Sequence, residues 1–319
     1  MDLRDLTPYL NKSSRDAYGL GLMQLAAEDA RIVCVTADVP ESARMHRLFE
    51  RWPERCFNFG IAEQNMMSAA AGLARCGKLP YVSVFAIFSA LRAAEQARTD
   101  VAYPNLPVRV CATHSGLSLG QGGPTHHSIE DVGIYRMMPN MTVVVPADAA
   151  EVIMVLDATH QLPGPLYVRL SRATEPTVYT QAREFQLGKA HWLRQGADLA
   201  ILACGACVGY ALQAAQALAV QGLQAAVLNM ASIKPLDRES VLAAAQQTGT
   251  LLVVEEHTIL GGLGSAVAET LAEAGIGIRF RRLGIPDAFS LAAPYPDLMA
   301  YYQLDAAGIT KNARELLMN

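Results

Sequence analysis

The sequence predicts an α/β fold of two domains, each with a mainly parallel sheet flanked by helices, and two observations support this. Short apolar or β-branched runs alternate with alanine-rich helical stretches along almost the whole chain, which is typical of parallel strands joined by helical crossovers. The chain has 319 residues and 51% of them are hydrophobic, enough for two cores because a domain usually takes about 100 to 200 residues. We expect domains at 1–175 and 191–319 with a linker at 176–190.

The first predicted domain alternates helices and strands in a regular order. Apolar residues at helical spacing predict helices at 15–29, 61–76, 88–101, 129–137 and 149–160. Short β-branched runs between them predict strands at 32–36, 79–84, 108–113, 142–145 and 166–170. The pattern lapses between residues 171 and 189, where a proline and mixed polarity favour a linker.

A second alternating unit follows the linker. It predicts strands at 199–203, 224–229 and 250–255, and helices at 208–221, 238–247 and 265–274. A glycine-rich turn, GGLG, at 261–264 precedes the last helix. Few polar residues stand at the ends of these strands, so we expect this domain to serve packing and association.

Charge and composition exclude several classes of function. The formal net charge is −4 and no cluster of lysine and arginine occurs, so neither nucleic acid nor an anionic membrane surface is an expected partner. The N-terminal residues carry charges and a proline in place of a secretory signal, and no stretch reaches the roughly 20 apolar residues of a membrane span. We expect a cytoplasmic protein.

The six cysteines are expected to be reduced thiols, because they lie mostly in apolar segments without the spacing of a zinc ribbon. Cys204 and Cys207 form a C-x-x-C pair where a strand passes into a helix. A redox or metal role and a place in the core at a tight turn are both open. The lack of a second pair favours the core.

Three residues of the first domain are candidates for binding a flat ligand. Glu63 stands in the first turn of an otherwise apolar helix, where it either complements the helix dipole or presents a buried carboxyl for proton exchange with a ligand. Phe85 and Phe88 follow a strand, three residues apart. They are either core aromatics or a pair of rings that stack on a heterocycle.

The segment THSGLSLGQGGPTHHSIED, residues 113–131, is the strongest local signal. It is rich in glycine and holds His114, His126 and His127 between a strand and a helix, so we expect a polar loop that approaches a ligand closely. Histidines supply hydrogen-bond donors or acid–base groups near neutral pH. Their spacing matches no standard zinc ligand set, which favours substrate contact over a metal.

Arg15, Ser42 and Arg172 each lie at an element boundary of the first domain. Two arginines and a hydroxyl that converge at strand ends would bind a phosphate through charge-assisted hydrogen bonds. Taken singly, each arginine is more often a solvated surface charge.

The chain resembles the C-terminal half of transketolases, the thiamine diphosphate (ThDP) enzymes, from about residue 10 to the end. Six segments carry the resemblance, in the family's order: GIAEQNMMSAAAGLA, VFAIF, THSGLSLGQGGPTHHSIED, PNMTVVVPAD, LYVRLSR and VVEEHTILGGLG. The resemblance implies that 1–175 is a pyrimidine-binding domain and 191–319 a transketolase C-terminal domain.

The resemblance also implies roles for the candidate residues around the cofactor. Glu63 matches the catalytic glutamate that hydrogen-bonds N1′ of the aminopyrimidine and sets its protonation. Phe85 and Phe88 match the aromatic pair around that ring, with Phe88 the better stacking candidate. Asp38 matches an acid beside the cofactor.

Toward the substrate, His126 matches a catalytic histidine near the reacting oxygens of the donor sugar, and His127 has no assigned role. The residues that match those holding the substrate phosphate are Arg15, Ser42, His114 and Arg172. The resemblance therefore implies a phosphorylated or otherwise anionic sugar as substrate.

Two departures from the family pattern shape this prediction. The sequence lacks the GDG motif with a downstream Asn that binds metal and diphosphate in the family. We therefore expect one subunit of a split transketolase that shares ThDP with an N-terminal subunit holding Mg²⁺ or Ca²⁺, in a two-plus-two heterotetramer.

The second departure lies in the glycine-rich loop. Residues 120–126 read GQGGPTH where full-length transketolases read GEDGPTH. Gly122 thus replaces an aspartate that reads sugar hydroxyls, which predicts a nonstandard, branched or modified sugar.

Two other functions stay open. The β subunit of a 2-oxo acid dehydrogenase has the same two domains, but the glycine-rich loop and the set Arg15, Ser42 and Arg172 favour transketolase. A non-catalytic regulatory subunit would be expected to lose the glutamate, and Glu63 is present.

Overall fold

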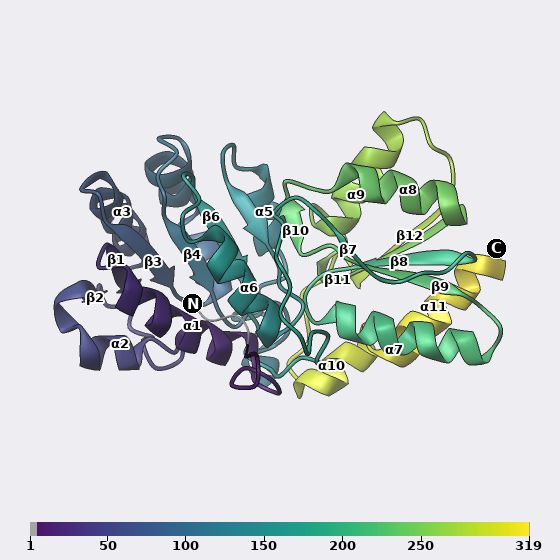
Figure 1. The fold of residues 1–319 in the computed structure, drawn as a ribbon, viewed down its shortest axis with the longest axis horizontal. Coiled ribbons are helices and arrows are strands. Elements are labelled where there is room, and N and C mark those ends of the chain that lie inside the picture. The colour runs from purple at the N-terminus through teal and green to yellow at the C-terminus, as the bar shows by residue number, and fades with distance from the viewer. Residues whose placement is uncertain (1–4, 319) are drawn as a thin grey trace.

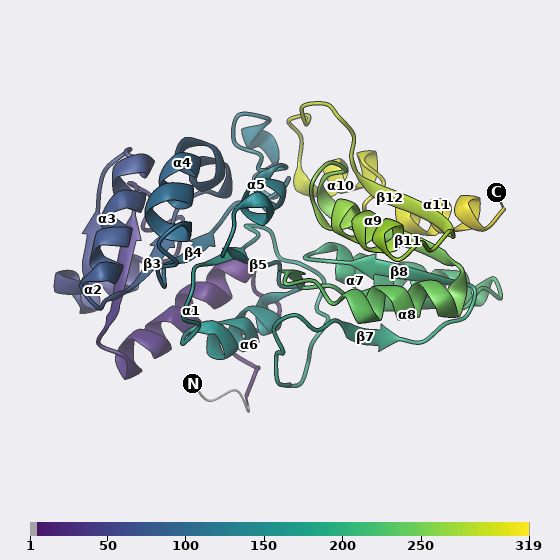
Figure 2. The ribbon, with the colours of Figure 1, turned by 90° about the horizontal axis from the view of Figure 1, so that it is seen from above.

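The computed structural model describes residues 5–318 and contains two α/β domains that lie side by side (Figures 1 and 2). One sheet has seven strands and the other has five, and both are mainly parallel. Helices cover both faces of each sheet. The predicted fold class is therefore confirmed.

The first sheet has the strand order β10-β5-β6-β4-β3-β1-β2. Six of these strands come from the first half of the chain: β1 (Ile32–Thr36), β2 (Cys56–Asn58), β3 (Leu79–Ser83), β4 (Arg109–Ala112), β5 (Thr142–Val144) and β6 (Leu166–Arg169). They pair in parallel. All their carboxyl ends consequently lie at one edge of the sheet.

Helices pack on this sheet in two groups that bury different faces. The group on one face is α1 (Ser14–Glu28), α2 (His46–Arg51) and α6 (Ala149–Thr159). The group on the other face is α3 (Glu63–Arg75), α4 (Ala94–Gln96) and α5 (Asp131–Met137). Figure 2 shows the two groups on opposite sides.

The second sheet has the order β12-β11-β8-β9-β7. Its strands are β7 (His191–Arg194), β8 (Leu199–Ala203), β9 (Ala225–Asn229), β11 (Thr250–Thr258) and β12 (Arg279–Ile285). The helices on one face are α7 (Cys207–Val220) and α11 (Ala306–Met318), those on the other are α8 (Arg238–Thr248) and α9 (Leu263–Glu273), and α10 (Tyr295–Tyr301) lies toward the first domain. In this sheet β7 runs antiparallel to its neighbour β9, and the other pairs are parallel.

One strand crosses between the halves of the chain. β10 (Ser232–Lys234) follows β9 in sequence but pairs antiparallel with β5 of the first sheet. Buried apolar side chains also form a continuous cluster from Leu22 and Ile153 to Val208 and Ile309. The two domains therefore share apolar core, and the position of one fixes the position of the other.

The segment after β3 departs from the predicted continuous helix at 88–101. Residues Phe88–Arg92 and Ala97–Ala102 form wide π-helical turns around the short α4. Such turns often occur at functional sites, because the extra residue changes where side chains point. Within residues 5–318, no helix is both long and apolar enough to cross a membrane.

Candidate active site

The candidate residues of the first domain gather at the carboxyl edge of its sheet. Asp38 follows β1, Phe85 follows β3 and His114 follows β4. Glu63 begins α3, and Arg172 lies shortly after β6. Open α/β sheets place their ligand sites at this edge.

Four rings form a row across the edge. The Phe85 and His114 ring centroids are 3.9 Å apart, and those of Phe85 and Phe88 are 5.8 Å apart with planes inclined by 19°. The ring of His126 then meets Phe88 edge-on at 5.4 Å. The structure thus brings both predicted phenylalanines and two of the predicted histidines together, with π-faces available to a flat ligand.

Glu63 lies buried at the first residue of α3, with 5% of its side chain exposed. Among residues 5–318 its side chain accepts a hydrogen bond from Arg92 alone, with Nη1 3.0 Å from Oε1. The Arg92 guanidinium also lies 4.0 Å from the Phe88 ring centroid. Arg92 therefore ties the carboxylate to the aromatic row.

Sequence reasoning missed Arg92. The available signal was its position four residues after Phe88, which brings two side chains to one side of a helical turn. Nothing in the sequence marks it as a partner of Glu63, which lies 29 positions away.

A cationic cluster, formed by Arg15, Arg44 and Arg172, borders the row at His114. Arg15 Nη1 lies 3.1 Å from the carbonyl oxygen of Ser42 and 3.2 Å from His114 Nε2. Arg15 Nε is buried without a hydrogen-bond partner. Because a guanidinium only donates, His114 Nε2 accepts, so Nδ1 carries the proton and donates to Thr113 Oγ1 at 2.9 Å.

Electrostatics keep His114 neutral. Burial, followed by the positive charges of Arg15, Arg172 and Arg44, lowers the pKa of His114 to about 3. Burial and Arg44, with a smaller effect of Arg172, also lower the pKa of Arg15 to about 10, against the opposing charge of Asp16. The arginines therefore create a strong positive potential that favours an anionic ligand group.

Arg44 is a second residue that sequence reasoning missed. Its Nε lies 2.5 Å from Asp16 Oδ1, and its backbone has a φ of 62°. A Cβ added at Gly19 would lie 2.6 Å from Arg44 Cβ, so α1 needs a glycine at that position for the two segments to approach. The positive φ follows no local sequence signal, and only the fold places Arg44 beside Arg15.

The remaining predicted residues of this edge lie farther out. Arg172 is exposed, and its backbone N–H donates to Ser118 Oγ at 3.1 Å. Ser42 is half-buried and turns its carbonyl oxygen to Arg15. Asp38 is exposed at a φ of 61°, with its N–H bound to Asn58 Oδ1 at 2.9 Å.

The glycine-rich loop is fastened to the second domain. His127 is buried, with Nδ1 2.7 Å from Ser290 Oγ and Nε2 2.8 Å from the carbonyl oxygen of Gly120. His127 therefore anchors the loop, while its neighbour His126 faces Phe88. At Gly122, an added Cβ would lie 2.6 Å from Leu119 Cδ2, so Leu119 fills the space that a side chain would take.

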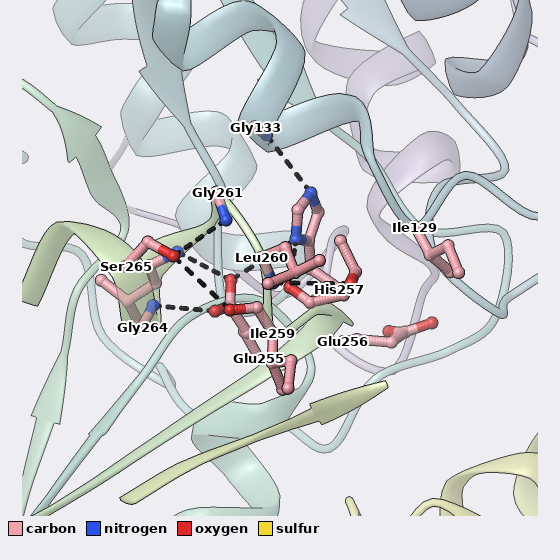
Figure 3. Close-up of polar contacts among 12 residues, drawn as sticks. Ile129, Gly133, Glu255, Glu256, His257, Ile259, Leu260, Gly261, Gly264 and Ser265 are labelled. Carbon is pink, nitrogen blue, oxygen red and sulfur yellow. Dashed lines mark hydrogen bonds and ion pairs between the residues drawn. The ribbon is translucent and has the colours of Figure 1, made fainter. Parts of the chain in front are cut away.

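The expectation that the second domain has few polar residues at its strand ends is wrong. Glu255, Glu256 and His257 lie buried near the end of β11. Glu256 and His257 face the first domain, and Glu255 faces the start of α9 (Figure 3). Glu255 accepts hydrogen bonds from the N–H groups of Leu263 and Gly264, at 2.7 and 2.8 Å, at the start of α9. The available signal was the polar run EEH at the end of an apolar strand, and sequence alone does not show that tertiary contacts bury it.

The C-x-x-C pair lies inside the second domain. Cys204 and Cys207 are free and buried, and burial raises the pKa of both thiols. A raised thiol pKa disfavours the thiolate that redox and metal chemistry need. No group of three or more His, Cys, Asp or Glu side chains in residues 5–318 is arranged to hold a metal ion.

Two family models match the chain. Residues 11–176 match the transketolase pyrimidine-binding domain and residues 188–309 match the transketolase C-terminal domain. One of the subunits of the apulose-4-phosphate transketolase of Phocaeicola vulgatus is 40% identical over 93% of this chain and 95% of its own length. The 6-deoxy-6-sulfo-D-fructose transketolase subunit SqwH of a Clostridium species is 39% identical over 95% of this chain and 94% of its own.

The solved structures agree with these relatives. A split-gene transketolase, described as an inactive β4 tetramer, superposes with a TM-score of 0.89 and 40% identity over 96% of this chain and 99% of that chain. The same family is indicated by both domain models, by relatives named as transketolase subunits and by a solved structure that matches nearly the full length. The chain therefore belongs to the transketolase family, with the family's pyrimidine-binding domain followed by its C-terminal domain.

Proposed function

We propose that this chain is the C-terminal subunit of a ThDP-dependent transketolase that transfers a two-carbon ketol unit between anionic sugars. It works with an N-terminal subunit that carries the diphosphate and Mg²⁺ or Ca²⁺ site, in a two-plus-two heterotetramer. The six free thiols suit a reducing compartment, so we place the complex in the cytoplasm. The observation that carries the proposal is the buried carboxylate of Glu63, which Arg92 connects to the ring pair of Phe88 and Phe85.

The residues present fit the pyrimidine end of the cofactor. The rings of Phe85 and Phe88 supply a flat apolar surface, and Glu63 supplies a carboxylate shielded from water. When bound, ThDP supplies the reactive carbon and the electron sink for the ketol unit. The sequence has no GDG motif, which supports a partner subunit as the holder of the diphosphate and the metal.

This chain's own residues bind, orient and control a proton. Glu63 holds a proton at N1′ of the aminopyrimidine, and Arg92 fixes the carboxylate that does so. Phe88 orients the ring, and Asp38 lies at the cofactor side of the same edge. His126, which packs on Phe88, would contact the oxygens of the donor sugar.

The cationic cluster supports an anionic sugar terminus. Arg15 and Arg172 would hold a phosphate, while the carbonyl oxygen of Ser42 and Nε2 of His114 orient the Arg15 guanidinium by accepting its hydrogen bonds. Two relatives carry apulose-4-phosphate and 6-deoxy-6-sulfo-D-fructose in their names, so relatives of this chain act on sugars with anionic groups that differ from the common pentose phosphates. Because Gly122 stands in the glycine-rich loop where full-length transketolases have an aspartate, we propose a nonstandard sugar for this chain as well.

The test is to purify the tagged chain from its source cells and identify what accompanies it. The proposal expects a stoichiometric partner with a GDG motif, bound ThDP, and ketol transfer in a panel of sugar phosphates. Turnover of xylulose 5-phosphate with ribose 5-phosphate as fast as any other pair would overturn the nonstandard sugar. A lipoyl-bearing partner would indicate 2-oxo acid chemistry, and recovery without partner or cofactor would indicate a regulatory subunit.

A further inference from the structure

We propose that Glu256, from the second domain, is the positioning residue for the substrate loop, defined here as residues 114–128. This inference rests on the proposed function, because that loop carries His114 and His126. It gives the second domain a part in substrate binding beyond association.

The carboxylate of Glu256 joins three segments. Its side chain is buried, with 5% exposed. Oε1 accepts a hydrogen bond from the backbone N–H of Leu117 at 2.6 Å, and Oε2 accepts one from the hydroxyl of Tyr295 at 3.0 Å. Glu256 thus connects β11 to the substrate loop on one side and to α10 on the other.

The loop is shaped to receive this carboxylate. Gly116 has a φ of 58°, and a Cβ added there would lie 2.4 Å from Glu256 Oε1. Any larger residue would therefore be strained in its backbone and would collide with the carboxylate. Gly116 also exchanges two backbone hydrogen bonds with Ser128, at 2.8 and 3.0 Å, which close the loop at its base.

The backbone around Glu256 is attached to the same base. Arg169 Nη2 donates to the carbonyl oxygens of Ser128 and Glu256, at 2.8 and 2.9 Å. The next residue, His257, accepts from the Gly133 N–H at 3.2 Å through Nε2 while Nδ1 donates to the Thr258 carbonyl at 2.7 Å. Figure 3 shows His257 directed at Gly133, and Glu256 directed away from Glu255.

These contacts hold the Glu256 side chain in one orientation. Its carbonyl, its neighbour and both carboxylate oxygens are all held, so the Leu117 N–H receives a preorganised acceptor. Leu117 lies three residues after His114 and nine before His126. Loss of the carboxylate therefore loosens the part of the loop that joins the phosphate side of the site to its reactive side.

Two variants of Glu256 separate positioning from simple packing. Glu256→Ala removes the acceptor for Leu117 and leaves a buried N–H without a partner. Glu256→Gln keeps an amide oxygen for Leu117, and its NH₂ group can donate to the Tyr295 oxygen. Glu269→Ala is the matched control, because Glu269 lies in the same domain but is largely exposed in a surface ion pair with Arg136.

The experiment compares these variants in the complete complex by hydrogen exchange, ThDP affinity and steady-state kinetics. For Glu256→Ala we expect exchange in peptides covering 114–128 to speed up about tenfold and kcat/KM for the sugar to fall about tenfold, the effect of one lost hydrogen bond to a charged group. The Kd for ThDP should change less than kcat/KM, because Glu63, Phe85 and Phe88 lie on other segments and, within residues 5–318, only the rings of His114 and His126 connect the loop to the two phenylalanines. Glu256→Gln should recover most of both losses, and Glu269→Ala should match the wild type.

Unchanged exchange in Glu256→Ala, or an equal loss of ThDP affinity, would overturn the proposal. If Glu256→Ala does not fold, Tyr295→Phe removes the hydrogen bond to the other carboxylate oxygen of Glu256. We expect a smaller increase in hydrogen exchange of residues 114–128. Unchanged exchange in Tyr295→Phe would contradict the positioning role. Absence of ketol transfer by the wild-type complex would refute the proposed function. It would leave the positioning role of Glu256 testable, because hydrogen exchange of the loop is measured without turnover.

Discussion

Arg92 donates a hydrogen bond to Glu63 across 3.0 Å, although the carboxylate is buried and 51% of the arginine side chain is exposed. The same guanidinium covers the face of Phe88. A buried carboxylate with one charged partner depends on that partner for its orientation. Arg92 therefore controls where the key carboxylate of the site points.

This relationship predicts the effect of changing Arg92. Arg92→Ala should lower kcat/KM for ketol transfer by about ten- to a hundredfold, because a hydrogen bond to a charged group is worth about 1.5–3 kcal/mol. The Kd for ThDP should rise in parallel. Leu91→Ala is the control for truncating an exposed side chain in the same turn, because Leu91 is the exposed neighbour of Arg92. Equal rates in the two variants would contradict the orienting role.

The cationic cluster predicts the protonation state of His114. Since burial and three arginines lower its pKa to about 3, the imidazole should stay neutral, with the proton on Nδ1, from pH 5 to 9. Nitrogen chemical shifts from NMR, assigned with a His114→Gln variant, should show no titration over this range. A midpoint near the ordinary histidine value of about 6.5 would contradict the described electrostatics.

The contact at Gly122 predicts a steric cost for a side chain. Gly122→Ala should lower the free energy of unfolding by about 1–3 kcal/mol, because its Cβ would press on Leu119. The double variant Leu119→Ala/Gly122→Ala should recover stability, since the obstructing atoms are gone. Gly72→Ala is the control, because a Cβ there meets no atom within 4 Å. Urea unfolding measures all three, and additive losses in the double variant would exclude the contact.

Glu175 predicts a dependence of stability on pH. Its buried carboxyl accepts hydrogen bonds from Ser14 at the start of α1, and burial raises its pKa to about 8 against those hydrogen bonds. The pKa is higher in the folded than in the unfolded chain, so the stability it contributes is complete below about pH 4.5 and is lost as the pH rises through 8.

The test is Glu175→Gln, which cannot ionise. Urea unfolding should show the wild type losing stability between pH 5 and 9, by on the order of a few kcal/mol, relative to the variant. Glu184→Gln, at an exposed position, should follow the wild type. Parallel curves for the wild type and Glu175→Gln would show that this carboxyl does not titrate as described.

Local sequence predicted the buried parallel strands well. β1 and β8 begin and end at the predicted residues, because each is a continuous run of buried apolar residues. β2, β7 and β10 were not predicted, since each is only three or four residues long and two of them are half-buried or exposed. β10 in particular is a strand only because β5 of the other domain pairs with it.

The sequence predicted site residues that a local pattern marks, but not the contacts between distant segments. An acid in the first turn of an apolar helix marked Glu63 as a candidate, and rings next to strand ends marked Phe85, Phe88 and His114. Arg92, Arg44 and Glu256 escaped because their partners lie 29, 28 and 139 positions away in the sequence. Such contacts depend on tertiary structure, and an arginine or glutamate on a helix or strand has no local pattern that reveals them.

The proposed function depends most on Glu63, as the residue that completes a ThDP site shared with a partner subunit. The most direct measurement is the rate of ThDP-dependent ketol transfer by the purified complex with wild-type chain and with Glu63→Gln, both assembled to the same stoichiometry. We predict transfer by the wild type and its abolition by Glu63→Gln while the complex stays intact. Transfer that persists in the Glu63→Gln complex would contradict the assigned role.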